Sequence, residues 1–193
     1  MPTLSRRSTL ALLLALPLSA CHFGYVAPNP NDPLRGVRNF VIEPLAYPAV
    51  VIGDQPEAAY LARKDEKQRS SWEVDKGESA ARYAGTALML GAQSGLSVAP
   101  PPPPGPGFFV LRPLVSFFEP GNFNGFFNKN TAMRITVQIF NDQAQQVDQV
   151  DLATVVQATL ANPSSGGRMR TAAEDLGRRV IHMVSRRSAG LPY

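Results

Sequence analysis

The only cysteine of this 193-residue chain, Cys21, stands directly after the chain's long apolar run. The paired arginines Arg6 and Arg7, an apolar core at residues 10–16 and small residues precede it. This order is typical of a secretory signal peptide, and a run of roughly ten apolar residues is too short to span a bilayer. A buried N-terminal helix is the alternative. If the leader uses the only thiol, the rest of the chain folds without disulfides or cysteine-based metal sites.

The last four residues of this leader, Leu18, Ser19, Ala20 and Cys21, resemble the lipobox of bacterial lipoproteins. The resemblance implies that the sulfur of Cys21 receives diacylglycerol. It also implies that a dedicated signal peptidase recognises Leu18, Ser19 and Ala20 and cuts before Cys21, whose freed amine then takes an N-acyl chain such as palmitate. Two or three acyl chains hold a protein stably on a membrane. The alternative is an ordinary signal-peptidase cut near Ala20 that leaves a free periplasmic cysteine.

The leader also bears on export and destination. Residues 5–10 resemble the twin-arginine export signal, except that Thr9 stands where a bulky apolar residue is usual, so both twin-arginine export and general secretion stay open. His22 follows the cysteine in place of the aspartate that retains enterobacterial lipoproteins in the inner membrane. By that resemblance we expect a periplasm-facing lipoprotein of the outer membrane, with the inner membrane as the alternative.

The chain divides into four parts. We expect a signal peptide at residues 1–20, the lipidated cysteine with a flexible tether at 21–36, a single α+β domain at 37–187 and a C-terminal tail at 188–193. The tether is expected because its sequence is rich in Pro, Asn and Gly without periodicity. With 44% apolar residues the chain can bury a real core.

The charge of the chain is less basic than its pI of about 9.5 suggests. Arg6 and Arg7 belong to the expected leader, which contains no acid, so the remaining chain carries 17 basic against 15 acidic residues. Bulk charge therefore gives no support to a nucleic-acid partner.

The hydrophobic pattern predicts strands and two amphipathic helices. A capping box of Ser70 and Glu73 predicts the start of the first helix, which runs to about Gly91. Strands are expected at residues 37–45, within 47–55, at 108–118, at 132–140 and at 147–159. Pro113 is expected to interrupt the strand at 108–118. In the strand at 132–140, the side chains expected to face inward are Met133, Ile135, Val137 and Ile139. Met169, Ala172, Ala173, Leu176, Val180, Met183 and Val184 define the second helix. This order predicts a mostly antiparallel sheet of about four strands with two helices packed on one face.

The run from Pro100 to Pro104 cannot form regular helix or central strand and favours polyproline II. It is either a stiff connector from helix to strand or a docking ligand for an aromatic-lined groove. The connector is preferred because such grooves are scarce in the bacterial envelope.

Residues 115–142 and 172–184 are similar to a family of uncharacterised proteobacterial lipoproteins. The resemblance rests on a strand that ends in an acidic-Pro-Gly-Asn turn, a Gly/Phe loop, a strand closed by aspartate and a C-terminal helix. It implies an α+β fold, and it carries no catalytic residues over to this chain.

The residues that carry most enzyme chemistry are scarce. The chain has two histidines, His22 on the tether and His182 on the last helix, without a second ligand four residues away. Asp148 and Asp151 lie three residues apart on a strand and so point to opposite faces. There is no P-loop, dinucleotide fingerprint or nucleophile elbow. We therefore expect no enzyme, no metal and no cofactor apart from the acyl groups on Cys21.

Two groups of residues are candidates for contacts. The aromatic cluster of the Gly/Phe loop, with Phe123, Phe126 and Phe127, could contact a partner or the membrane, or else belong to the core. Four arginines of the last helix could contact an anionic surface, or else form a solvated face: Arg178, Arg179, Arg186 and Arg187. We expect a non-enzymatic interaction or accessory module that binds an envelope protein; the alternative is a carrier or sensor of a hydrophobic, lipid-like ligand.

Overall fold

The computed structural model describes residues 29–124 and 128–193. In this part the chain forms a mixed sheet of seven strands and three helices. The strands are β1 (Asn39–Ile42), β2 (Val51–Ile52), β3 (Gln55–Pro56), β4 (Ser97–Ala99), β5 (Phe109–Glu119), β6 (Thr131–Phe140) and β7 (Gln146–Val156). The helices are α1 (Glu57–Ala62), α2 (Glu66–Gln93) and α3 (Ser165–Ser188).

The fold is α+β, as predicted, but its sheet is not the mostly antiparallel sheet of about four strands. β5, β6 and β7 form the expected antiparallel meander. On its other edge β5 pairs in parallel with β1 at one end and with β2 at the other, and β4 pairs in parallel with β1. The prediction missed this because β2 and β4 are only two and three residues long, too short to show a strand period.

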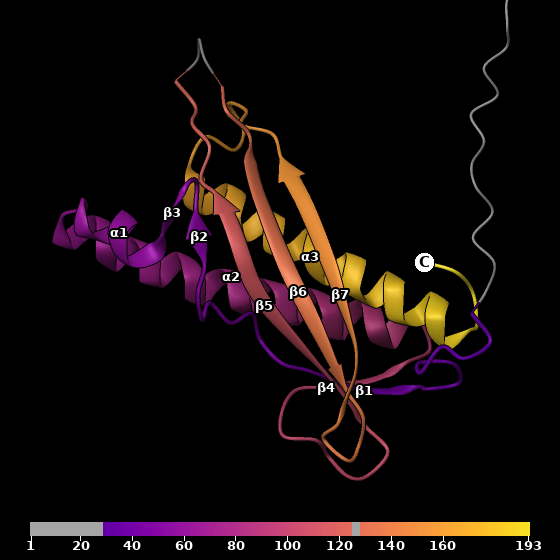
Figure 1. Cartoon of the computed structure of the whole chain (residues 1–193). Helices are drawn as coiled ribbons and strands as arrows, with labels where there is room; N and C mark the ends of the chain where they lie inside the picture. Colours follow the sequence, from indigo (N-terminus) through magenta and orange to yellow (C-terminus); the bar gives the residue numbers. More distant parts are fainter. Residues whose placement is uncertain (1–28, 125–127) are drawn as a thin grey trace, which may run out of the picture.

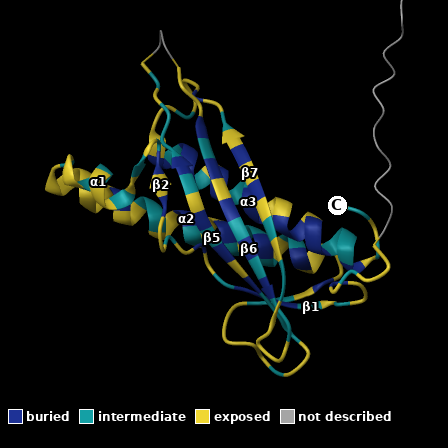
Figure 2. Cartoon of the chain, viewed as in Figure 1, coloured by how far each residue is buried: buried dark blue, intermediate teal, exposed yellow. Residues whose placement is uncertain are grey.

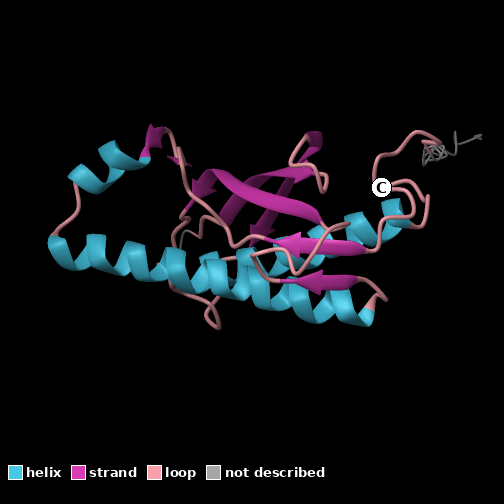
Figure 3. Ribbon diagram, turned by 90° about the horizontal axis from the view of Figure 1, so that it is seen from below, coloured by secondary structure: helices cyan, strands magenta, loops and turns pink. Residues whose placement is uncertain are grey.

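The two long helices cover one face of the sheet (Figure 1), as the sequence predicted. α3 packs behind β6 and β7, and α2 packs along α3 and against β1 and β4. Seen from below, the helices form one layer and the sheet a second (Figure 3). The other face of the meander is open.

The core lies between these layers, and buried and exposed residues alternate along β5–β7 (Figure 2). The residues predicted to face inward from β6 and α3 are all buried. They are Met133, Ile135, Val137, Ile139, Met169, Ala172, Ala173, Leu176, Val180, Met183 and Val184. Period-2 and period-3.6 patterns in long elements are therefore reliable here because one face of each element is fully buried.

Helix α2 begins five residues earlier than predicted, since its N-cap is Asp65 and not Ser70. The Asp65 side chain accepts a hydrogen bond from the backbone N–H of Gln68 while the Gln68 side chain bonds the Asp65 N–H. Ser70 and Glu73 imitate the same capping pattern but lie inside the helix. The charged segment before Ser70 thus contains the true capping box.

Pro113 does not interrupt β5. The carbonyl of Pro113 and the N–H of Val115 bond to Ala46, so this side of β5 faces the β1–β2 edge rather than β6. The missing N–H of Pro113 points to the same side, into the gap between β1 and β2, and costs no hydrogen bond to β6.

The chain enters the fold earlier than residue 37. Leu34 is fully buried, and the N–H of Gly36 bonds the carbonyl of Ser188 at 2.9 Å. Residues 32–36, expected to belong to the tether, therefore pack on the end of α3. The proline run connects β4 to β5, with bends at residues 101–102 and 104–105. Pro100 to Pro104 are exposed.

The close approach of α2 and α3 generates a first prediction. A Cβ at Gly177 would lie 2.7 Å from the Tyr83 carbonyl oxygen, whereas a Cβ at Gly85, on the exposed side of α2, would meet nothing within 4 Å. Gly177→Ala should lower the free energy of unfolding by about 1–3 kcal/mol through overpacking. Gly85→Ala should raise it by about 0.5–1 kcal/mol, because alanine favours helix over glycine.

Urea denaturation of the two variants measures both changes. Since both are glycine-to-alanine changes in a helix, the propensity gain is shared and the difference reports the packing alone. Equal stabilisation by both would contradict the close packing of the helices.

Candidate functional site

The two ends of α3 organise the surfaces that can carry function. One end, at Ser188, holds the first described residues of the chain. The other, at Ser165, holds the loop between β5 and β6. At a rise of about 1.5 Å per residue, the 24-residue helix separates these ends by roughly 36 Å.

Arg168, in the first turn of α3, fixes the loop end. The residue is 1% exposed and its guanidinium bonds to neutral oxygens only. Nε donates to Thr131 Oγ1 at 2.7 Å, Nη2 to the Pro120 carbonyl at 3.0 Å, and Nη1 to the carbonyls of Asn162 and Pro163. Burial lowers the pKa of Arg168 from its ordinary value. The arginine thus joins both stems of the β5–β6 loop to the β7–α3 connection.

Apolar side chains lie on the surface at this loop end. Leu160 is 84% exposed and Val155 62% exposed, and Phe123 is half-buried. Asn130 accepts a hydrogen bond from the Ala158 N–H, which holds the two loops side by side. Phe126 and Phe127, predicted to belong to the same contact, lie outside the described residues. We call Phe123, Val155 and Leu160 the tip patch.

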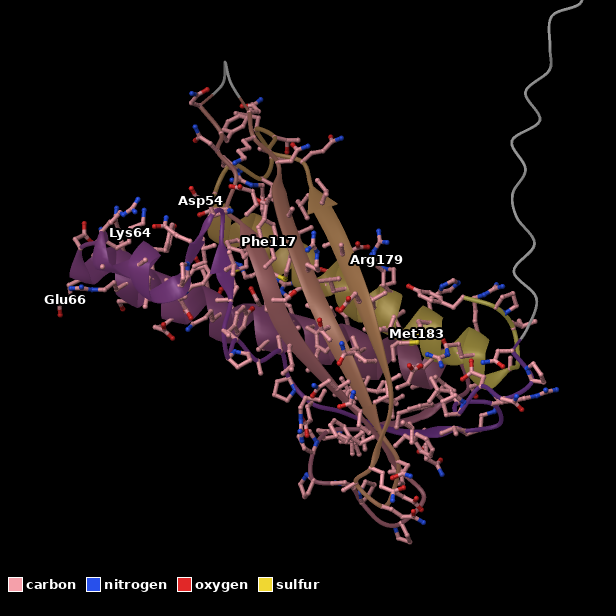
Figure 4. All side chains as sticks on the ribbon, in the orientation of Figure 1. Asp54, Lys64, Glu66, Phe117, Arg179 and Met183 are labelled. Atoms are coloured by element: carbon pink, nitrogen blue, oxygen red, sulfur yellow. The ribbon has the colours of Figure 1, made fainter. Side chains whose placement is uncertain are left out.

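A shallow hollow adjoins this end of the molecule. It is lined by Ile52, Gly53, Asp54, Gln55, Tyr60, Glu119, Pro120, Gly121 and Lys129. Figure 4 labels Asp54 at the β2–β3 turn, next to the β5–β6 loop. The ion pair of Lys129 with Glu119 at 2.6 Å lies on its rim, so the hollow is polar and open rather than a closed pocket.

The predicted anionic-contact arginines are largely paired within the chain. Arg178 pairs with Glu174 and Asp175, and Arg179 pairs with Asp175 at 2.7 Å. Arg179 lies on the β7 side of α3 (Figure 4). Arg187 pairs with Asp32 at 2.8 Å and with Asp148 at 2.5 Å, and only 13% of its side chain is exposed. Arg186 has no acidic partner; its Nε donates to the Pro192 carbonyl.

Burial and ion pairing shift the pKa values of three aspartates. Burial raises the pKa of Asp32, but hydrogen bonds from Arg187 and the Leu34 N–H and the charge of Arg187 outweigh it, so the pKa of Asp32 is lowered. Burial likewise raises the pKa of Asp175, but hydrogen bonds from Thr154 and Arg179 outweigh it, so the pKa of Asp175 is also lowered. For Asp75, beside Arg170 and Glu78, burial prevails and the pKa is raised.

On the face of the meander that the helices do not cover, two arginines lie over aromatic rings. The Arg112 guanidinium lies 4.8 Å from the ring centre of Phe140, and Arg134 lies 5.6 Å from that of Phe117. Arg112 also pairs with Glu43 at 2.7 Å. Beside them a hollow of about 270 Å³ lies under the proline-rich loop, lined in part by Pro103, Phe108, Val110 and Phe140.

The acidic and histidine side chains of the described part do not converge on a metal site. Within this part, no group of three or more His, Cys, Asp and Glu side chains is placed to hold a metal ion. Asp148 and Asp151 face opposite sides of β7, as predicted: Asp148 pairs with Arg187 and Asp151 accepts from Thr136. Cys21, with Leu18, Ser19 and Ala20, lies outside the described residues.

Sequence reasoning missed the part that Arg168 has in the structure. Two of the four oxygen atoms that bind its guanidinium come from Pro120, 48 residues away, and from Thr131, 37 residues away. No local pattern marks such a residue, because its environment is created only by the tertiary fold.

Comparison with known proteins finds no protein family and no curated protein that match the chain. Two solved structures are similar. A minor lipoprotein from Acinetobacter baumannii is 13% identical, with a TM-score of 0.40, over 77% of this chain and 94% of that chain. The PelC dodecamer from Paraburkholderia phytofirmans is 8% identical, with a TM-score of 0.39, over 74% and 86%. With TM-scores this low, neither likeness bears on the function of this chain.

A second prediction concerns Arg168. Arg168→Met keeps the length of the side chain but leaves the carbonyls of Asn162 and Pro163 and the hydroxyl oxygen of Thr131 without their donor, while the Pro120 carbonyl keeps its bond from Thr131. Buried groups left unsatisfied cost about 1–3 kcal/mol each, so the free energy of unfolding should fall by roughly 3 kcal/mol or more. In the matched variant Arg178→Met, an exposed pair is lost and the change should stay below about 1 kcal/mol. Urea denaturation compares the two, and similar losses would refute the role of Arg168.

A third prediction concerns acid. Because the folded state lowers the pKa of Asp32, its ionised form stabilises the fold at neutral pH. That stability is present above the ordinary carboxyl pKa of about 3.9 and is lost as the pH falls through the lower folded value. In Asp32→Asn, thermal melts between about pH 5 and pH 2 should lose less stability than those of the unchanged chain. Parallel profiles would show that Asp32 is not held by Arg187.

Proposed function

We propose that this chain is a lipid-anchored protein of the bacterial outer membrane, whose domain faces the periplasm and acts as a non-enzymatic interaction module. One observation carries the anchor: the sole cysteine closes a leader of paired arginines, a short apolar core and Leu18-Ser19-Ala20. A diacylglycerol on its sulfur and an N-acyl chain would hold the protein stably. The outer membrane is proposed because His22, not aspartate, follows the cysteine.

The structure supports the anchor by where the chain enters the domain. Asn29, the first described residue, is exposed, and the chain there lies at the Ser188 end of α3. An anchored segment can therefore leave the domain from its surface. The helices of the described part include none that is both long and apolar enough to cross a membrane.

The interaction module is proposed because of the tip patch. Val155 and Leu160 are exposed apolar residues at the end of the domain opposite to the chain entry. A partner that covers these side chains would remove their apolar surface from water, which favours association. Arg168 holds the loops beneath the patch, which would present it on a rigid support. The expected partner is an envelope protein.

The carrier of a hydrophobic ligand is the second proposal, and the packing favours it less. The side chains between sheet and helices form one continuous buried cluster. The hollow under the proline-rich loop has about 270 Å³, just below the range of about 300–1,000 Å³ usual for small-molecule sites. A lipid-like ligand would need a larger apolar cavity than this one.

The anchor is tested by Cys21→Ala. Without the thiol no thioether can form, so the protein should leave the membrane fraction or accumulate as the uncleaved precursor, and it should not incorporate labelled palmitate. His22→Ala, one residue further on, keeps the thiol and should stay anchored, cleaved and labelled. Fractionation with palmitate labelling measures both. If Cys21→Ala gives a cleaved, membrane-bound protein, the lipid is not the anchor.

The interaction module is tested by Leu160→Asp. Because this side chain is 84% exposed, the change should leave the melting temperature within a few degrees while it removes the main crosslinked species in cells. Met89→Asp, on the exposed side of α2 and 55% exposed, is the matched control and should keep that species. Crosslinks unchanged in Leu160→Asp would contradict the assignment of the tip patch.

A further inference from the structure

The end of the domain at which the chain enters has a defined surface of its own. Residues 32–37 pack on the last turn of α3 through the Asp32–Arg187 ion pair and the bond from the Gly36 N–H to Ser188. The Arg35 side chain lies over Gly190, and Arg186 bonds to Pro192. Residues from both ends of the described chain thus form one surface.

This surface carries positive charge that the protein leaves uncompensated. Arg35, Arg38 and Arg186 make no ion pair with any of the fifteen acidic residues of the chain, all of which lie in the described part. Arg187, by contrast, pairs with two acids, Asp32 and Asp148, so this buried cluster carries one negative charge and the three free arginines exceed it by two. Arg35 and Arg38 are exposed and Arg186 is half-buried. Three cations are therefore free to meet an external anion.

Apolar and aromatic groups accompany these cations. Leu191 is 48% exposed and Tyr193 is 49% exposed. The Tyr193 ring packs edge-on against His182 at 6.0 Å between ring centres, so it is held at the surface. Tyrosine combines an apolar ring with a polar hydroxyl and is enriched at the membrane–water interface. We call Arg35, Arg38, Arg186, Leu191 and Tyr193 the basal patch.

We propose that the basal patch rests on anionic phospholipid headgroups of the membrane that holds the lipid anchor. The proposal rests on the proposed function, because the anchor brings this end to the membrane. Seven residues separate Cys21 from Asn29, and covalent geometry limits their reach to about 25 Å. The guanidinium groups would bind lipid phosphates, while Leu191 and Tyr193 enter the interface.

The geometry distinguishes this end from the other cationic region. Arg63, Lys64, Lys67 and Arg69 surround the start of α2, but Asp65 and Glu66 lie among them. Lys64 and Glu66 lie at the end of α2 remote from the chain entry (Figure 4). A 28-residue helix is about 42 Å long, beyond the reach of the anchored segment. This region provides the matched control.

The test uses the mature chain without lipid, residues 22–193, which contains every described residue. Its sedimentation is measured with vesicles of phosphatidylcholine alone and with vesicles containing phosphatidylglycerol. We expect binding to the anionic vesicles that weakens with salt. Replacing Arg35, Arg38 and Arg186 by Gln should weaken it about a hundredfold, at about fivefold for each charge. Replacing Arg63, Lys64 and Lys67 by Gln removes the same charge and should change it by less than threefold.

Two outcomes would overturn the proposal. Equal losses from the two triple variants would mean that net charge alone drives binding, and equal binding to neutral vesicles would mean that the anionic headgroup is not the ligand. Circular dichroism melts of both triples confirm that they fold. Because this chain carries no acyl group, a negative result here leaves the fractionation of Cys21→Ala unaffected, and the two proposals can fail separately.

Discussion

The contact between residues 32–37 and the last turn of α3 is the constraint on which the arrangement of this molecule depends. Asp32 pairs with Arg187 at 2.8 Å, and Gly36 and Val37 bond to Ser188 beside it. Since only 12–13% of the Asp32 and Arg187 side chains is exposed, solvent screens the pair little. This contact sets the point from which β1 starts and the point at which an anchored segment leaves the domain.

From that point the domain has two ends, and each carries one of the proposed contact surfaces. α3 runs from the chain entry to Arg168, and Arg168 in turn joins the β5–β6 loop to the β7–α3 connection. The lipid anchor would hold the basal patch near the membrane, and the tip patch would then face away from it. This geometry favours a protein partner for the tip patch over the membrane that holds Cys21, a choice that the sequence left open.

The sequence predicted those parts of the fold in which one face is buried along a long element. The alternation at Met133, Ile135, Val137 and Ile139 and the helical spacing from Met169 to Val184 both identified the core side. It failed where pairing is set by distant residues: the two-residue strand β2 joins β5 through Phe117 and Phe118. It also failed at α2, where Ser70 and Glu73 imitate the capping box that Asp65 and Gln68 form.

The candidate sites show the same division. The leader and Cys21 are local patterns, and the sequence alone yields them. Of the four arginines predicted to meet an anionic surface, three are in ion pairs with acids of α3, β7 or the entry segment, and Arg186 remains. Arg35 and Arg38 join it only because the fold places residues 32–37 on the end of α3, which no periodicity of the sequence indicates.

The orientation of the anchored domain is the central claim, and label depth measures it most directly. Cys21 is the only cysteine, so in the lipidated protein a single new thiol can be labelled cleanly. A fluorophore at Leu191→Cys should be quenched by quencher-bearing lipid headgroups, and one at Leu160→Cys should not. Equal quenching at both positions, or quenching at Leu160→Cys alone, would contradict an upright domain with the basal patch on the membrane.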